Sequence, residues 1–370
     1  MEVDAAGRAA PGRVLIVLLG AIGDVVRALP LLGRIRRAWP NAYIAWAAEP
    51  KSAPILRSNR WLDELLIYDR RQAPWSFVPF LRKVRAGRFD LAIDLQRHLK
   101  SGVIALTSGA SDRLGFAAPN TKEFNHLFST RQIEPQPNLR LKLAQYQIFA
   151  DTLGLPPAPI EFGLELTPEE DAHAKKLLAS LPRPMLGVIL GSSWPSRLYF
   201  PEAVAEVIRS LAFPVEGSPA LYPVLIGGPE ETAQAEAVMS ELGEISALNL
   251  TGQTTLRELI RIFSECAVAF GPDSGPMHIA AAVGCPVVSL WGSTSPDRSA
   301  PWGFADLVIR AEIPCHPCYL RECPIGRECM RRISPSAVAS AIRRAMRSYP
   351  RSFSEKSLVQ PESLSAGKAE

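Results

Sequence analysis

The stretch Arg13–Pro30, RVLIVLLGAIGDVVRALP, decides the fold that we expect for this chain. Its opening run is apolar without interruption after the arginine, as in a strand of a parallel sheet covered on both faces. Gly20 and Gly23 then lead into Asp24 and a helical pattern that runs to Trp39. A strand, a glycine-broken turn and a helix form half of a βαβ unit, and ligands bind at such turns. By its position Asp24 is expected to cap the helix, and a cap that points at a ligand can also act as a base.

The alternation of strand and helix continues through the first half of the chain. Strands are expected at 42–48, 64–69, 89–96 and 112–116, and helices at 51–58, 76–86, 99–107 and 139–153. Residues 117–137 are polar and are expected to form a loop. The proline-rich segment 153–170 breaks the pattern and predicts a domain boundary.

The second half repeats the pattern. Strands are expected at 184–191, 222–228, 246–252, 267–271 and 286–292, and helices at 201–211, 230–242, 256–266, 276–283 and 336–347. We therefore predict an α/β protein with two Rossmann-like domains, residues 13–160 and 161–349, facing across a cleft. Residues 1–12 and 350–370 are expected to be disordered.

Composition and charge narrow the class of protein. The chain has 370 residues, of which 47% are hydrophobic and 21% charged, and its apolar stretches are too short to span a bilayer. The N-terminus lacks the apolar core of a signal peptide, which predicts a cytoplasmic protein. Residues 1–165 hold 22 Lys/Arg against 15 Asp/Glu, whereas residues 166–370 hold 19 against 22. The basic first half favours an acidic partner such as a phosphorylated glycan or an anionic membrane surface.

The run GPDSGPMHIAAAVG, residues 271–284, carries the strongest site signal. A strand ends at Gly271, and Asp273, Ser274 and Gly275 form a turn into a helix. The free amides at the start of that helix predict an anion site, to which Ser274 adds a hydroxyl. His278 lies one turn further on. The alternative is that Asp273 or Ser274 only caps the helix and His278 is a core residue.

Two further turns of the second half carry groups that suit a nucleotide. GSSWPSR offers the hydroxyls of Ser192 and Ser193 and the permanent charge of Arg197, and LIGGPEE offers Glu231 for ribose hydroxyls. The alternative is that the acidic residue at this position only stabilises the start of the following helix, where acids are equally typical. The chain has neither a Walker lysine motif nor G-x-G-x-x-G, which favours a nucleotide bound as a diphosphate leaving group.

Several segments, taken in order, resemble glycosyltransferase family 9, the lipopolysaccharide heptosyltransferases. They are RVLIVLLGAIGDVVRALPLLGRIRRAWPNAYIAW, GRFDLAIDLQ, DRLGF, GSSWPSR, VLIGGPEE, NLTGQTTLRELIRI and GPDSGPMHIAAAVGCPVVSLWGSTSPD. The resemblance spans about Arg13 to Arg347. It implies a GT-B fold and inverting transfer of a heptose from ADP-heptose to the inner core of a lipid A-linked oligosaccharide. It also implies that no metal or other cofactor is required for catalysis.

The resemblance also implies roles for particular residues. Asp24 matches the general base of the family. The donor would bind the residues of the second domain, namely Ser192, Ser193, Arg197, Glu231, Asp273, Ser274, Gly275 and His278. Where the family has His-Thr, this chain has Arg27 and Ala28, which leaves the acceptor, and with it the sugar, open. The expected acceptor-binding residues are the basic Arg27, Arg60, Arg97, Lys100 and Arg113.

Two other functions stay open. One is a GT-B glycosyltransferase that uses another nucleotide sugar or another cell-surface glycan, and the other is a catalytically inactive relative that binds nucleotides. A nucleic-acid partner is not expected, because no known module is present. Work on a lipid-linked acceptor would place the protein at the cytoplasmic face of the inner membrane.

Four cysteines near the C-terminus form a separate motif. Cys315, Cys318, Cys323 and Cys329 have the spacing C-x2-C-x4-C-x5-C, which is compatible with a structural zinc or iron–sulfur site. The alternative is a set of reduced thiols or a redox pair.

Overall fold

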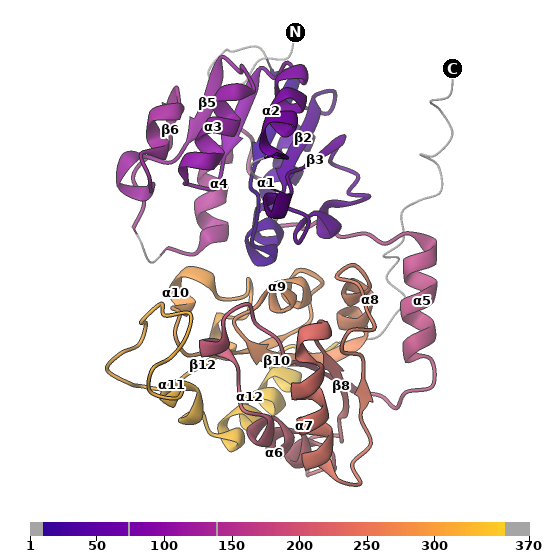
Figure 1. Cartoon of the computed structure of the whole chain (residues 1–370). Coiled ribbons are helices and arrows are strands. Elements are labelled where there is room, and N and C mark those ends of the chain that lie inside the picture. Colours follow the sequence, from indigo (N-terminus) through magenta and orange to yellow (C-terminus); the bar gives the residue numbers. More distant parts are fainter. Residues whose placement is uncertain (1–9, 73–74, 138–139, 352–370) are drawn as a thin grey trace. The chain divides into compact units, whose positions relative to one another are not determined.

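The computed structural model describes residues 10–72, 75–137 and 140–351 and divides the chain into two compact units (Figure 1). Unit 1 ends at Gly163 and unit 2 begins at Leu164, inside the proline-rich segment. Most of the two terminal segments expected to be disordered, 1–12 and 350–370, lies outside the described residues. None of the described helices has the length and apolar character needed to cross a membrane.

Unit 1 is built on a parallel six-stranded sheet. Its strands are β1 (Arg13–Val17), β2 (Tyr43–Ala48), β3 (Glu64–Ile67), β4 (Leu91–Asp94), β5 (Asp112–Gly115) and β6 (Arg131–Gln132), in the order β3-β2-β1-β4-β5-β6. This is the Rossmann order, in which the chain reverses direction across the sheet between β1 and β4. The carboxyl ends of β1 and β4 are therefore the expected ligand position in this unit.

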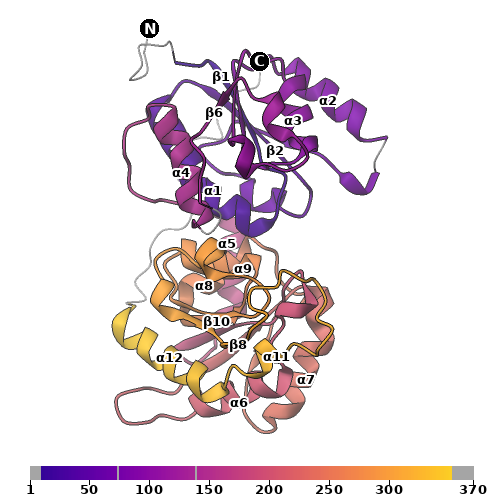
Figure 2. The same cartoon turned by 90° about the vertical axis from the view of Figure 1, so that its left-hand side faces the viewer.

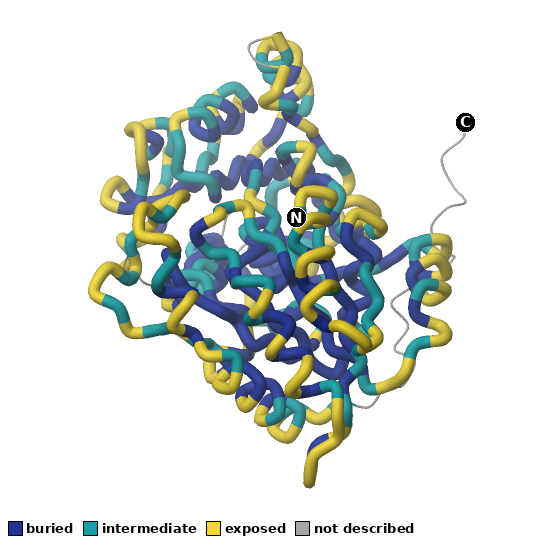
Figure 3. Tube along the Cα trace, turned by 60° about the horizontal axis from the view of Figure 1, so that its bottom comes forward, coloured by how far each residue is buried: buried dark blue, intermediate teal, exposed yellow. Residues whose placement is uncertain are grey.

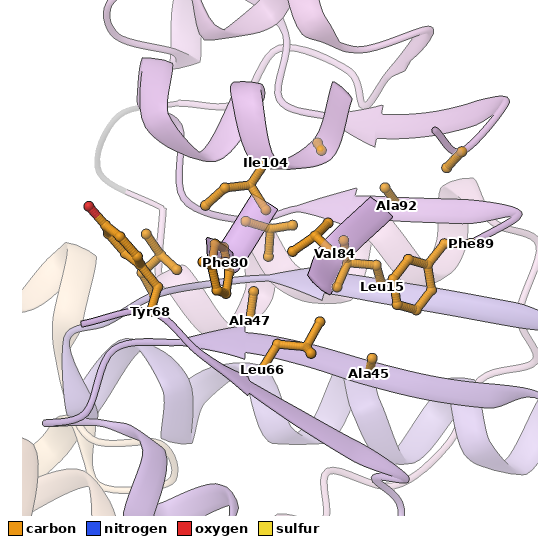
Figure 4. Packing of buried hydrophobic residues seen from close by; sticks show 14 residues of the cluster. Leu15, Ala45, Ala47, Leu66, Tyr68, Phe80, Val84, Phe89, Ala92 and Ile104 are labelled. Carbon is orange, nitrogen blue, oxygen red and sulfur yellow. The ribbon is translucent and has the colours of Figure 1, made fainter. Parts of the chain in front are cut away.

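Helices cover both faces of the unit 1 sheet (Figure 2). They are α1 (Ile22–Ala38) and α4 (Lys142–Thr152) on one face, and α2 (Phe77–Ala86) and α3 (Leu99–Thr107) on the other. Alternate side chains of β1 and β2, such as Leu15 and Ala47, face Phe80 and Val84 of α2 in one buried cluster (Figure 4). The expected helix at 51–58 is only the 3-10 turn Ala53–Leu56.

Unit 2 repeats the architecture. Its strands are β7 (Met185–Ile189), β8 (Tyr222–Ile226), β9 (Leu248–Asn249), β10 (Cys266–Pro272), β11 (Val287–Trp291) and β12 (Val308–Arg310), all parallel in the order β12-β11-β10-β7-β8-β9. The central strands β7, β10 and β11 are buried along their whole length (Figure 3). Here the reversal lies between β7 and β10.

The helices of unit 2 also lie on both sides of their sheet (Figures 1 and 2). α6 (Pro201–Leu211) and α12 (Pro335–Ser348) pack together on one side, and α8 (Glu258–Glu265) and α9 (Gly275–Ala282) pack together on the other. α7 (Thr232–Leu242) packs on α6. Two short helices, α10 (Pro296–Ser299) and α11 (Glu328–Arg331), flank the cysteine segment.

The longest helix that was not expected from the sequence is α5 (Pro168–Leu178). It begins in the last residues of the proline-rich segment 153–170, where we predicted a domain boundary. Thr167 and Glu170 form a capping box at its start, which is a recognisable helix signal after the prolines. Two ion pairs fasten α5 to α8 and its N-cap. Arg257, the N-cap residue, holds the partly exposed Glu170, and Arg261 Nε lies 2.5 Å from Asp171 Oδ1 in a buried pair.

Candidate active site

The prediction that Asp24 caps the first helix is wrong. The cap is Ala21, and Asp24 is the third residue of α1, where its own N–H already donates to the Ala21 carbonyl at 2.9 Å. No side chain caps this helix. The carboxylate of Asp24 is therefore not used by the helix end and is available for other partners.

Two cations hold the Asp24 carboxylate. Lys142 Nζ, from the first residue of α4, lies 2.6 Å from Asp24 Oδ1, and the Arg27 guanidinium pairs with the same oxygen. The exposed fractions of the Asp24, Arg27 and Lys142 side chains are only 16%, 9% and 18%. Burial alone would raise the pKa of Asp24, but the charges of Lys142 and Arg27 outweigh it and hold the pKa far below its usual range. Asp24 is thus an ionised, charge-compensated carboxylate.

A side chain just after β4 fixes the turn that carries Asp24. Gln96 Oε1 accepts hydrogen bonds from the backbone N–H groups of Leu19 at 2.9 Å and Gly20 at 3.4 Å. From the other side, Ser52 Oγ donates to the Leu19 carbonyl at 2.6 Å. Gln96 thereby ties the ends of β1 and β4 together at the point where the sheet order reverses.

Sequence reasoning missed both Lys142 and Gln96. Lys142 stands 118 positions from Asp24 and Gln96 stands 77 from Leu19, so no local spacing links them to the turn. The signal that could have found Gln96 is the order of the strands in the sheet. Gln96 ends the segment expected to be the fourth strand, and the carboxyl end of that strand lies beside the first in a Rossmann sheet.

The other basic residues predicted to bind the acceptor have different surroundings. Arg60 is exposed beside the Trp61 ring, and Lys100 Nζ lies 5.2 Å from the centre of the Tyr68 ring. Arg97 stacks 3.9 Å from the centre of the Phe116 ring and donates to Gln145 of α4. Arg113 donates to the carbonyls of Phe128 and Ala110, both at 2.7 Å, so its guanidinium has a structural task.

In unit 2, four predicted donor residues come together where the sheet order reverses. Ser192 and Arg197 follow β7, and Asp273 and Ser274 follow β10. Arg197 Nη1 lies 3.2 Å from Asp273 Oδ2, and Ser192 Oγ donates to the Asp273 carbonyl at 2.7 Å.

Asp273 orients the arginine rather than standing open to a ligand. Thr294 Oγ1 donates to the Asp273 carboxylate at 2.8 Å, which fixes that carboxylate against Arg197. The Arg197 guanidinium also stacks 4.1 Å from the centre of the Trp194 ring. Held on two sides, the arginine is a pre-positioned cation at the carboxyl edge of the sheet.

The hydroxyl of Ser274 has no hydrogen-bond partner among the described residues. Ser274 is 8% exposed, and its Oγ atom is buried without a hydrogen bond at the N-terminus of α9. The side chain does not cap α9, so the capping alternative for Ser274 is wrong. Gly275 begins the helix, and His278 is buried one turn further on. A buried hydroxyl beside helix amides and a fixed arginine suits a phosphate group.

Glu231 lies at the same edge of the sheet but also has a local task. Its Oε2 accepts the Gly228 N–H at 2.7 Å, which closes the turn after β8. The carboxylate lies against Gly191, where an added Cβ would come within 2.5 Å of Glu231 Cδ. Glu231 therefore stands directly beside the turn that carries Ser192 and Ser193.

The cysteine motif extends from the segment after β12 into α11. All six cysteines are free thiols, and the described part of the chain contains no group of three or more His, Cys, Asp or Glu placed to hold a metal ion. Cys315 is exposed, whereas Cys329 is buried beneath Gly292. Cys323 Sγ accepts the Arg327 N–H at 3.2 Å. Burial and the neighbouring thiols of Cys315, Cys318 and Cys323 raise the pKa of Cys329, so the four cysteines lie near one another. The zinc or iron–sulfur site stays a prediction.

Comparison with known proteins decides the family. The model of glycosyltransferase family 9 (heptosyltransferase) matches residues 78–328, which is more than half of the chain. This chain belongs to glycosyltransferase family 9. It is accordingly a glycosyltransferase, and the GT-B fold expected from the resemblance is confirmed by the two parallel sheets and by the solved structures of similar fold.

Individual members of the family are distant in sequence. The lipopolysaccharide core heptosyltransferase OpsX of Haemophilus influenzae is 25% identical over 302 residues, covering 81% of this chain and 84% of the relative. A family 9 glycosyltransferase structure from Veillonella parvula matches with a TM-score of 0.75 at 22% identity, covering 94% of this chain and 99% of the other. The E. coli ADP-heptose lps heptosyltransferase II matches with a TM-score of 0.72 at 20% identity, covering 91% and 99%.

Proposed function

We propose that this glycosyltransferase moves a heptose from ADP-heptose to the inner core of lipid A-linked lipopolysaccharide, with inversion at the sugar carbon. Family membership and the names of its relatives support the heptose and the lipopolysaccharide. The observation that carries the proposal is that each unit has a candidate site where the strand order of its sheet reverses. A charge-compensated carboxylate stands at the reversal point of one sheet, and a phosphate-type site stands at that of the other.

The proposal assigns the nucleotide to unit 2. The diphosphate of ADP would accept hydrogen bonds from Ser274 Oγ and the first amides of α9, and Arg197 would neutralise its charge. Ser192, Ser193 and Gly275 would line the same place, and Asp273 would act through Arg197. Glu231 would reach the ribose, and His278 would complete the donor site. As the bond between the sugar carbon and the phosphate oxygen breaks, Arg197 and the α9 amides would stabilise the charge that builds on ADP.

The acceptor is assigned to unit 1. An acceptor hydroxyl would attack the sugar carbon on the face opposite ADP and give its proton to Asp24. Lys142 and Arg27 would bind an acidic group of the acceptor, and Arg60, Arg97 and Lys100 would hold more distant parts of the glycan. When these two cations turn to the acceptor, Asp24 loses part of its compensation, its pKa rises and it becomes a better base.

The lipid-linked acceptor also implies a place in the cell. We propose that the protein is cytoplasmic and contacts the cytoplasmic face of the inner membrane peripherally. We propose no metal ion or other cofactor for the reaction.

A panel of donor sugars tests the proposal. At equal concentration, the ligand that binds the folded state more tightly raises the thermal midpoint more, so ADP-heptose should give a larger shift than UDP- or GDP-sugars. Incubation with a lipid A-linked inner-core acceptor should then release ADP and extend the glycolipid by one heptose. A larger shift with a UDP- or GDP-sugar, and transfer from that donor, would contradict the assigned substrate.

A further inference from the structure

The segment 70–88 of unit 1 is unusually basic. It contains Arg70, Arg71, Arg82, Lys83, Arg85 and Arg88 and no acidic residue. Its central part is α2, which presents one face to the sheet and one to solvent. Phe80 and Val84 are buried against the sheet (Figure 4). Arg82, Lys83 and Arg85 are exposed on the outer side.

Large apolar side chains are exposed among these charges. Trp75, just ahead of α2, is 86% exposed, and Val78 of α2 is 53% exposed. Trp75, Ile67 and Pro79 line an open pocket of about 470 Å³ with Lys83 at its margin. A tryptophan this exposed has no packing role in unit 1.

The apolar surface continues over the neighbouring elements. α3 packs beside α2, and the 3-10 turn η4 (Asn125–Phe128) packs on α3. Phe124 and Leu127 at η4 are 74% and 71% exposed. Every large hydrophobic residue that is exposed in the described part of unit 1 lies between Ile67 and Leu127. We call this surface of α2, α3 and η4 the basic-apolar face.

We propose that the basic-apolar face docks unit 1 on an anionic phospholipid bilayer. Arg and Lys beside a bilayer are attracted by anionic headgroups, and exposed tryptophan favours the headgroup level. An amphipathic helix with bases on one side and aromatic or aliphatic residues beside them lies in the membrane interface. Arg82, Arg85 and Arg88 form no ion pair with described residues, so their charge is not cancelled by the protein itself.

The aliphatic side chains favour a bilayer over a nucleic acid or another polyanion. Val78 and Leu127 gain nothing from phosphate charges in water, whereas both gain from transfer to an acyl boundary. The inference rests on the proposed function for its setting, since a lipid-linked acceptor brings the enzyme to a membrane. The test below involves no sugar transfer, so either idea can fail without the other.

The experiment is sedimentation of the full-length protein with sucrose-loaded vesicles. Vesicles of phosphatidylcholine with phosphatidylglycerol should bind the protein, and vesicles of phosphatidylcholine alone should bind it far less. Added salt should weaken binding because the contacts are ionic. Arg82→Ser/Arg85→Ser should weaken partitioning at least tenfold, since each surface base contributes about fivefold. Trp75→Ser should weaken it severalfold with the thermal midpoint unchanged.

Matched variants in unit 2 control for charge and exposed apolar area. Arg310→Ser/Arg347→Ser removes the same charge from two exposed positions, and Phe213→Ser removes a side chain that is 66% exposed. Both should bind vesicles like the native protein. Failure of the native protein to bind anionic vesicles would overturn the proposal. An equal loss of vesicle binding in the control variants would also overturn the proposal. So would tight binding to heparin together with vesicle binding that Trp75→Ser leaves unchanged.

Discussion

Lys142 Nζ lies 2.6 Å from Asp24 Oδ1, which joins the first residue of α4 to the third residue of α1. Arg34 reinforces the same helix pair by donating to Asp151 of α4 at 2.9 Å. The ion pair therefore sits on a rigid frame, and its geometry does not depend on a surface loop. Asp24 in this frame is set to stay ionised until an anionic partner competes for its cations.

Replacing Lys142 with methionine should change the pH dependence of transfer. Removing one cation raises the pKa of Asp24, and a base must be deprotonated, so the acid limb of the kcat/KM profile should move to higher pH. The loss of a charged contact to the acceptor should lower kcat/KM at pH 7 by about 10- to 100-fold. Lys51→Met, at an exposed position of the same unit, should leave the profile unchanged. If the acid limb of the Lys142→Met profile does not move, Lys142 does not control the pKa of Asp24 during transfer.

Substitutions in unit 2 should weaken nucleotide binding without unfolding the protein. Arg197→Met removes the fixed cation and should raise the Kd for ADP by about 10- to 100-fold in calorimetric titration. Ser274→Ala removes a hydroxyl that has no hydrogen-bond partner in the described part of the chain, so it should raise the Kd by about 2- to 10-fold with an unchanged thermal midpoint. Ser246→Ala, on an exposed residue just before β9, is the control and should bind ADP normally. Native ADP affinity in Arg197→Met would refute the placement of the diphosphate.

The ion pair between Asp171 and Arg261 should govern the stability of unit 2 in acid. Both residues are 4% exposed, and Lys175 adds a second contact to Asp171 at 3.1 Å. Burial alone would raise the pKa of Asp171, but Arg261 and Lys175 outweigh it and lower the pKa below its usual value of 3.8. The unfolded state therefore binds the proton more tightly, and this stabilisation is present above pH 3.8 and is lost as the pH falls toward the lower folded value.

Arg261→Met leaves a buried carboxylate with one partner and should lower the free energy of unfolding by about 3 kcal/mol at pH 7 in urea titrations. Its loss of stability below pH 4 should be shallower than in the native protein, because the pKa of Asp171 is then no longer lowered by Arg261. Arg332→Met breaks a surface pair with Glu328 and should cost less than about 0.5 kcal/mol. An equal decrease in the free energy of unfolding in the two variants would show that burial does not determine how much an ion pair contributes to stability.

Gly271 should be intolerant of any side chain. An added Cβ would lie 2.5 Å from the Ile189 carbonyl oxygen, a backbone atom that cannot turn aside. Gly271→Ala should therefore cost about 1–3 kcal/mol and weaken ADP binding, because Gly271 immediately precedes the turn of Asp273 and Ser274. In Gly12→Ala the nearest atom lies at 3.4 Å, an ordinary contact, and stability should be unchanged. Thermal unfolding of the two variants checks the contrast.

The sequence predicted where the strands end more reliably than it predicted which side chains meet at those ends. Continuous apolar runs such as residues 14–17 indicate buried strands, and the Rossmann order then brings Arg197 and Asp273 together. The pairing of Lys142 with Asp24 depends on how α4 packs on α1, which no local pattern encodes. The spacing of the four cysteines likewise does not determine how their thiols are arranged, and the metal site that it favours stays a prediction.

The role of Asp24 is tested most directly by the Asp24→Asn variant with ADP-heptose and a lipid A-linked inner-core acceptor. Mass analysis of the glycolipid and calorimetry with ADP are done on the same protein preparation. We predict that the native protein adds one heptose and that the variant is slower by about 10²- to 10⁴-fold, the usual contribution of a general base. The Kd of the variant for ADP should stay native, because the residues that we propose bind the nucleotide lie in unit 2. Transfer by Asp24→Asn at the native rate would contradict the account.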